Sequence, residues 1–322
     1  MPLTTDPKLL TLSRDVIEGF DKANGDVHAG FRPAHAKGIL LTGTFTPSAD
    51  AASLTRAPQI QRNSTPVTVR FSDFAGIPTV PDNGREASPR GIAIRFHLAE
   101  HSHTDIVAHS VDTFPVRTAE GFLEFLNALI ATDPAGPHPN AIEQFLGAHP
   151  AALAFVQIPK PIPTSFGKES FFAVSAFKFT NAAGATRFGR YRILPVAGNE
   201  YLSDTQAAAQ TPNFLFDEIK NRVVKEPVKF RIVVQLAEDG DTTDDATVRW
   251  PETRALLAFG EISLTAVAPD NATEQQHIIF DPIPRVDGIE ASADPLFEPR
   301  ANVYLMAGRR RRAAEKAIGT GQ

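Results

Sequence analysis

Regular alternation of apolar and polar residues is the main pattern along this chain, and it predicts strands. Apolar residues occupy positions 67, 69 and 71 of the segment 66–74, which leaves Arg70 and Ser72 together on the opposite face. The same period runs through 91–98 and 228–236. Shorter apolar runs predict further strands over 39–45, 105–110, 170–180, 188–194 and 260–266.

A spacing of three to four residues between apolar positions predicts helices in separate blocks. One covers 7–23, before the stop signal Asn24-Gly25. The others cover about 118–132, 140–146 and the stretch from Pro150 to Pro159, and one opens at 211–213. Because strands and helices do not alternate strictly, the order favours an antiparallel sheet or barrel of the α+β class. No repeat or linker divides the chain, so we expect a single domain over 1–322.

Composition narrows the class of protein. The chain has 322 residues, of which 42% are hydrophobic, and a net charge of -5, which argues against a nucleic-acid binder. The absence of cysteine excludes disulfides, iron–sulfur clusters and a thiolate-ligated haem. No run of 18 apolar residues and no signal-peptide pattern occur, so we expect a cytoplasmic protein without a membrane partner.

Two short segments carry residues suited to chemistry. Arg32 and His35 lie in a basic loop just before the strand predicted at 39–45. Arg300 stands four residues before Tyr304, so on a helix the two side chains share a face. Each segment is ordinary by itself, because a loop histidine is most often solvated and a tyrosine is most often a core or interface aromatic.

Taken together, these segments resemble the haem catalase family, and within it the small catalase-related peroxidases. The resemblance runs from about Arg32 to Arg311. It is carried by His35-Ala36-Lys37-Gly38, Val69-Arg70-Phe71-Ser72, Trp250-Pro251, Phe280-Asp281-Pro282, Gly288-Ile289-Glu290 and Arg300-x-x-x-Tyr304. It implies an eight-stranded antiparallel β-barrel with helices outside it. The expected parts are an N-terminal helix (1–26), the barrel with its helices (27–270) and a C-terminal segment (271–322) on the proximal side of haem b.

The resemblance also implies roles for individual residues. His35 would be the distal histidine that moves the proton of the peroxide, and the hydroxyl of Ser72 would orient it. Tyr304 would ligate the iron as a tyrosinate that Arg300 stabilises. The other residues expected to contact the cofactor are Arg32, Arg70 and Arg311 at the propionates, Phe122 on the distal haem face, and Phe280.

One position departs from the family pattern. Where catalases place an asparagine beside the distal histidine, the match through Phe114–Arg117 puts Ser110, next to His109. The asparagine amide is missing, and so are the long N-terminal arm, the wrapping segment and the C-terminal extension of full-length catalases. Both differences favour a peroxidase. We therefore expect reduction of hydrogen peroxide and organic hydroperoxides through an oxoferryl intermediate, with a small organic reductant and weak catalase activity.

Several alternatives stay open. The protein could isomerise hydroperoxides, as the allene oxide synthase relatives of catalase do, or it could be a non-catalytic barrel that binds a lipid or haem. His101 and His103, two residues apart on a strand, could bind a metal, although a solvated hairpin tip explains them equally well. The electron donor, the preferred peroxide and the oligomeric state are undetermined, with a homodimer among the options.

Overall fold

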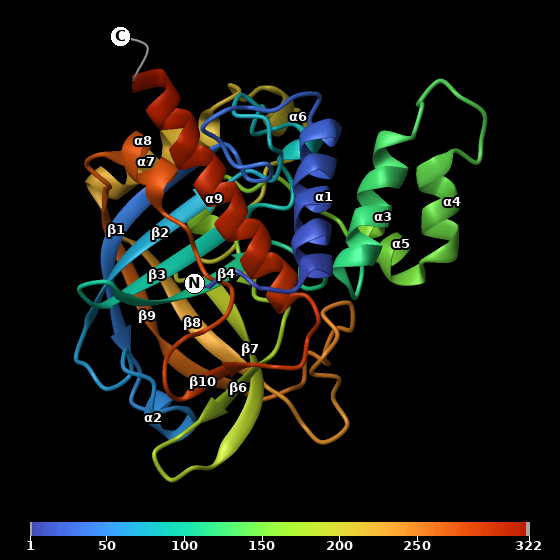
Figure 1. The fold of residues 1–322 in the computed structure, drawn as a ribbon. Coiled ribbons are helices and arrows are strands. Elements are labelled where there is room, and N and C mark those ends of the chain that lie inside the picture. Colours follow the sequence, from blue (N-terminus) through green and yellow to red (C-terminus); the bar gives the residue numbers. More distant parts are fainter. Residues whose placement is uncertain (1, 320–322) are drawn as a thin grey trace.

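A closed β-barrel forms the centre of the computed structural model, which describes residues 2–319 and the side chains of 2–314 (Figure 1). Hydrogen bonds join the strands in the ring β1-β2-β3-β4-β5-β7-β8-β9, which closes through β9–β1 and β7–β8, so the barrel has eight strands. Neighbouring strands are antiparallel. The bounds are β1 (Gly38–Pro47), β2 (Thr65–Ser72), β3 (Gly91–Ala99), β4 (Ser102–His109), β5 (Phe171–Phe172), β7 (Thr186–Pro195), β8 (Val228–Leu236) and β9 (Leu256–Val267). This confirms the expected fold class.

Two short strands extend the sheet at β7. They are β6 (Phe177–Thr180) and β10 (Ile289–Ala291). The strand predicted over 170–180 is therefore two strands, β5 and β6, with the residues between them outside the ladder.

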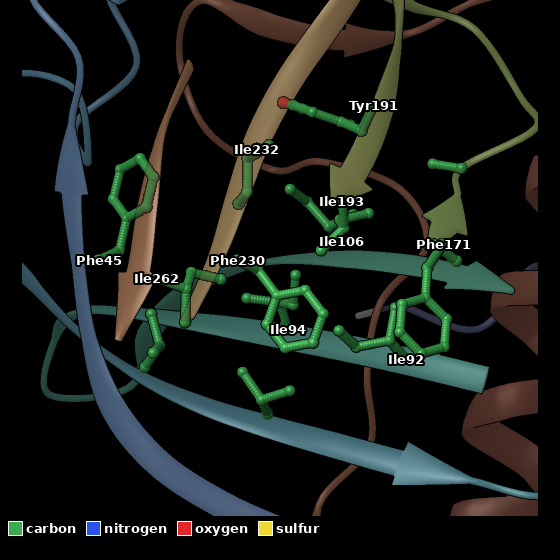
Figure 2. Close-up of a cluster of buried hydrophobic side chains, with 14 of the residues drawn as sticks. Phe45, Ile92, Ile94, Ile106, Phe171, Tyr191, Ile193, Phe230, Ile232 and Ile262 are labelled. Atoms are coloured by element: carbon green, nitrogen blue, oxygen red, sulfur yellow. The ribbon is translucent and has the colours of Figure 1, made fainter. Parts of the chain in front are cut away.

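Large apolar side chains fill the interior of the barrel (Figure 2). Phe71 stacks on Phe166 with ring centroids 5.3 Å apart, and Phe45 meets Phe96 edge to face at 5.0 Å. Other side chains in this cluster are Ile92, Ile94, Ile106, Phe171, Tyr191, Ile193, Phe230, Ile232 and Ile262. Since these side chains occupy the centre of the barrel, the site must lie elsewhere. A barrel that carries a lipid inside is also not supported.

The helices lie outside the barrel. In the described part of the chain they are α1 (Pro7–Ala23), α2 (Ala51–Leu54), α3 (Ala119–Ile130), α4 (Ala141–Ala148), α5 (Pro150–Gln157), α6 (Asp204–Ala208), α7 (Phe214–Lys225), α8 (Asn271–His277) and α9 (Phe297–Gly319). Asp6 caps α1, and Asn140 with Glu143 forms a capping box on α4. In Figure 1, α9 crosses in front of β2, β3 and β4, with α1 beside it. None of the described helices is long and apolar enough to cross a membrane.

Strand register gives the outer face of β1–β4 two rows of side chains. Paired residues of an antiparallel sheet point to the same face. The row at one end of these strands is Gly38, Ser72, Gly91 and His109. The next row is Leu40, Arg70, Ala93 and Val107, on which Phe280 and Ile278 pack. The segment before α9 thus lies on the outer face that carries Arg70 and Ser72.

Candidate active site

His35 is fixed over the first of these rows. Its backbone has a φ of 58°, a conformation that costs energy outside glycine, and two hydrogen bonds hold it: His35 N–H to Phe74 O (2.6 Å) and Ala36 N–H to Ala75 O (3.0 Å). The imidazole Nδ1 lies 3.1 Å from the hydroxyl of Ser72. The structure therefore brings together His35 and Ser72, as the sequence predicted.

Gly91 makes room for this ring. A β-carbon at Gly91 would lie 2.8 Å from Nδ1 of His35 and 2.9 Å from Cε1, closer than real contacts allow. The Nδ1–Cε1 edge of the imidazole thus faces the strand, and Nε2 is the nitrogen left for another partner. None of the sequence motifs that carried the resemblance includes Gly91, so this role was not predicted.

The surroundings keep His35 uncharged. Burial lowers the pKa of His35 to about 3, and the charge of Arg70 and the nearby His109 act in the same direction. A backbone hydrogen bond with Asp73 opposes the shift only in part. At neutral pH the ring is therefore a neutral proton acceptor.

His109 belongs to the row over which His35 lies, and it is close to His35. It pairs with Gly91 across the β3–β4 ladder, so its side chain rises from the outer face next to the His35 ring. Burial lowers the pKa of His109 to about 3, with smaller contributions from Arg300 and Lys160. Val111 N–H donates to its Nδ1 at 3.3 Å, and its Nε2 is buried with no hydrogen-bond partner among the described residues.

Ser110 does not belong to this row, which corrects the expectation from sequence. Its hydroxyl accepts a hydrogen bond from Arg90 N–H at 2.9 Å, and its own N–H donates to Arg90 O at 2.9 Å. These bonds tie the end of β4 to the turn before β3. The residue of β4 that lies beside His35 is His109. The alternation of Asp105, Val107 and His109 along the strand indicates that His109 and Ser110 point in different directions, and the pairing with Gly91 selects His109.

A series of aromatic rings connects the two histidines. Phe74 lies edge-on to His35 at 5.4 Å, and Phe114 lies 6.3 Å from His109. Phe20 and Phe122 complete the path, through centroid distances of 6.5 Å (Phe20–Phe74), 5.5 Å (Phe20–Phe122) and 5.5 Å (Phe114–Phe122). Each of these six residues is partly exposed, although His35 and His109 are deep in the fold. Phe20, Phe74 and Phe114 had no predicted role.

Three arginines gather at one end of this region without acidic partners. Arg32 donates to Gln275 O (3.1 Å) and Ile278 O (3.0 Å), and Arg311 donates to the same Ile278 O (2.9 Å). Arg70 donates to Gln275 Oε1 (3.0 Å) and to the carbonyls of His35 and Ala36. Within residues 2–314, no carboxylate lies within ion-pair distance of any of the three guanidinium groups.

Mutual repulsion and burial weaken the protonation of these arginines. Burial lowers the pKa of Arg70 to about 9 and that of Arg311 to about 10, and neighbouring arginine charges add to both shifts. The pKa of Arg32 is also well below its usual value, through burial and the charges of Arg70 and Arg311, while nearby Tyr304 opposes the shift. An anion bound among them would relieve both effects.

Tyr304 and Arg300 share one face of α9, as their spacing predicted. A guanidinium nitrogen of Arg300 lies 3.4 Å from the phenol oxygen, and the guanidinium carbon is 5.8 Å from the ring centroid. Tyr304 also interacts electrostatically with Arg32, one of the three grouped arginines. The charge of Arg300 also acts on His109, so the turn of α9 that carries Arg300 lies near the row with His109.

Two other predicted positions have different surroundings. Phe280 packs on Leu40, and its ring lies 5.2 Å from the guanidinium of Arg95, so it contacts the second row. His101 lies at the β3–β4 hairpin tip with 92% of its side chain exposed. No group of three potential metal ligands occurs among the described residues, so the hairpin-tip interpretation is favoured.

Comparison with known proteins identifies the family. A family model described as catalase matches residues 26–317. A catalase-related peroxidase from Mycolicibacterium paratuberculosis is 35% identical over 292 residues, which cover 88% of this chain and 90% of the relative. Another from Synechococcus elongatus is 32% identical and covers 87% of this chain and 83% of the relative.

Longer relatives and solved structures agree. Catalase-2 of Bacillus subtilis is 28% identical over 85% of this chain, but only 42% of that relative is covered. A fungal catalase structure superposes with a TM-score of 0.77 at 23% identity, covering 88% of this chain and 59% of that one. Catalase A from Saccharomyces cerevisiae gives 0.77 at 22% identity, over 88% and 62% of the two chains. The barrel, the matched family model and the similarity over most of the chain together show that this protein belongs to the catalase family.

Proposed function

We propose that this protein is a haem-dependent peroxidase that reduces hydrogen peroxide and organic hydroperoxides at the expense of a small organic reductant. The observation that carries the proposal is the group formed by Arg32, Arg70 and Arg311. The three guanidinium groups are largely enclosed and have no carboxylate partner. Burying a charge without an opposite charge costs several kcal/mol in folding free energy. The two propionates of haem b supply the charge that this group lacks.

Tyr304 fits the role of iron ligand. With no cysteine in the chain, a thiolate ligand is excluded, and a phenolate is a known alternative ligand of haem iron. Arg300, 3.4 Å from the phenol oxygen, supplies the positive charge that stabilises a phenolate. When bound there, haem supplies the electron transfer that peroxide reduction requires.

His35 fits the role of proton carrier. Its ring is neutral at physiological pH, and Ser72 and the space above Gly91 fix its orientation. Nε2 is then available to take the proton of a bound hydroperoxide and to return it to the departing oxygen. The phenylalanines between His35 and His109 exclude bulk water and offer an apolar surface to the organic part of the substrate.

Peroxidase activity is favoured over catalase activity for two reasons. The relatives with the highest similarity quoted above are named catalase-related peroxidases. In addition, the site has an imidazole at His109 and no asparagine amide in this row. We therefore expect rapid oxidation of an organic donor and slow release of oxygen from hydrogen peroxide.

Two assays test the proposal on purified protein supplied with haem. Oxidation of a phenolic dye is followed with hydrogen peroxide and with an organic hydroperoxide, while an oxygen electrode records dismutation. Fast dye oxidation that disappears in His35→Ala supports the proposal. Conversion of a fatty-acid hydroperoxide without consumption of the dye would favour the isomerase alternative, and inactivity in all assays would contradict both.

A further inference from the structure

His109 is a polar side chain of the site that has no assigned role. Neither the family pattern nor the proposed mechanism uses it. It belongs to the row on the outer face over which His35 lies, with Gly91 opposite it in the ladder. Its Nε2 is buried and has no hydrogen-bond partner among the described residues. A buried polar atom without a partner is costly, so its presence calls for an explanation, such as a ligand.

Local hydrogen bonds fix which nitrogen of His109 carries the proton. A backbone N–H can only donate, so Nδ1, which receives Val111 N–H at 3.3 Å, must be an acceptor. In a neutral imidazole the other nitrogen then carries the hydrogen. Nε2 of His109 is therefore a donor, and it lies at the end of the ring that is farthest from the backbone.

His35 has the opposite arrangement. The backbone hydrogen bond with Asp73 favours protonation, so the Asp73 backbone accepts a hydrogen from the ring. Nδ1 is the ring nitrogen on the side of Ser72, the residue before Asp73, and lies 3.1 Å from the Ser72 hydroxyl, so we assign the hydrogen to Nδ1. Nε2 of His35 is then the free acceptor. The two neighbouring imidazoles thus offer one acceptor and one donor.

We propose that His109 is a second substrate-binding residue, whose Nε2–H donates a hydrogen bond to the peroxide oxygen while Nε2 of His35 accepts the peroxide proton. This inference rests on the proposed peroxidase function. A hydroperoxide, R–O–O–H, carries one acidic proton and lone pairs on both oxygens, so it matches an acceptor beside a donor. The imidazole N–H of His109 thereby performs the hydrogen bonding for which an amide at Ser110 was expected.

Cyanide is a suitable probe, because hydrogen cyanide must lose a proton to a base and the bound anion is stabilised by a donor. Equilibrium cyanide affinity is measured by absorbance on haem-loaded wild type, His109→Leu, His109→Asn and the control His138→Leu. His138 is an exposed residue bound to Glu143, far from the row in sequence and contacts. Loss of a hydrogen bond to a charged group should weaken affinity about 10- to 100-fold in His109→Leu. His109→Asn keeps an N–H donor and should recover most of the affinity.

Three results would overturn the inference. Affinity of His109→Leu equal to wild type would show that no donor is lost, and an equal loss in His109→Asn and His109→Leu would indicate a packing role only. If both variants fail to hold haem, nitrogen-15 NMR of the wild-type ferrous carbonyl form decides, and a hydrogen on Nδ1 of His109 would overturn the assignment. Failure of wild type itself to bind haem would instead contradict the proposed function.

Discussion

Gly91 and His35 are in such close contact that a single methyl group on Gly91 would displace the imidazole, because its β-carbon would lie 2.8 Å from Nδ1. The same β-carbon on Gly91 would also lie 2.7 Å from the hydroxyl oxygen of Ser72, so the space is bounded by the His35 ring and by Ser72. The position of the proton acceptor therefore depends on a residue that has no side chain.

Gly91→Ala should consequently impair catalysis while the protein remains folded. We expect haem binding to persist and the bimolecular rate with peroxide to fall at least about tenfold, since a misplaced acid–base group loses part of its contribution. Stopped-flow absorbance measures this rate. Gly147→Ala is the matched control, because nothing lies within 4 Å of a β-carbon there. Equal rates in both variants would show that the ring does not need this space.

Removal of the imidazole itself gives a larger effect. His35→Ala should keep haem, because the arginines and Tyr304 remain, and slow the reaction with peroxide by about 10²- to 10⁴-fold. His138→Ala serves as the control on an exposed histidine. A near-normal rate in His35→Ala would transfer the proton acceptor role to another group, and His109 would be the first to examine.

The low pKa of His35 predicts an unusual pH profile. An ordinary histidine loses its function as a base when pH falls through about 6.5. In this site burial lowers the pKa to about 3, so the ring stays neutral well below 6.5, and only a pH near 3 protonates it. The rate with peroxide should be constant from about pH 8 down to about pH 5. A fall centred near 6.5 that is absent in His35→Ala would contradict the lowered pKa.

Tyr304→Phe tests the proximal assignment. We expect loss of haem or weak binding with a changed spectrum, because the phenolate has no thiolate substitute in this chain. Arg300→Ala should be milder, with haem retained and the midpoint potential raised, since the tyrosine becomes a weaker electron donor. Haem titration and potentiometry measure both effects. An unaltered high-spin spectrum in Tyr304→Phe would exclude this residue as the ligand.

Ser110 should affect stability and leave peroxide chemistry unchanged. Its hydroxyl accepts the hydrogen bond from Arg90 N–H, so Ser110→Ala should cost about 1 kcal/mol in the free energy of unfolding. Denaturant unfolding measures this loss, and the rate with peroxide should match wild type. A rate that falls in Ser110→Ala without a loss of stability would restore Ser110 to the reacting site.

Strong local patterns allowed much of the fold to be predicted from sequence. The helix over 7–23 is α1 with the same bounds, and the alternation in β2 correctly placed Arg70 and Ser72 on one face. The helix α8 was not predicted because none of its residues is buried, so it has no apolar period. The break between β5 and β6 also leaves no signal, since the apolar composition continues through it.

The site was harder to predict than the strands because it depends on register between strands. Alternation shows that His109 and Ser110 differ in direction, but only the pairing of His109 with Gly91 shows which of them lies beside His35. The contact of Phe20 with Phe122 similarly joins α1 to α3, and no local pattern encodes such a contact. The sequence patterns therefore singled out most of the candidate residues, while only long-range packing showed that His109, and not Ser110, lies beside His35.

The most direct test of the account is an absorbance titration of the purified protein with haem b, followed on wild type and on Tyr304→Phe. We expect wild type to bind one haem per chain with a Soret band and the long-wavelength charge-transfer band of a high-spin tyrosinate complex, and Tyr304→Phe to lose that charge-transfer band. The account would be contradicted if wild type took up no haem. It would also be contradicted if wild type and Tyr304→Phe gave the same spectrum.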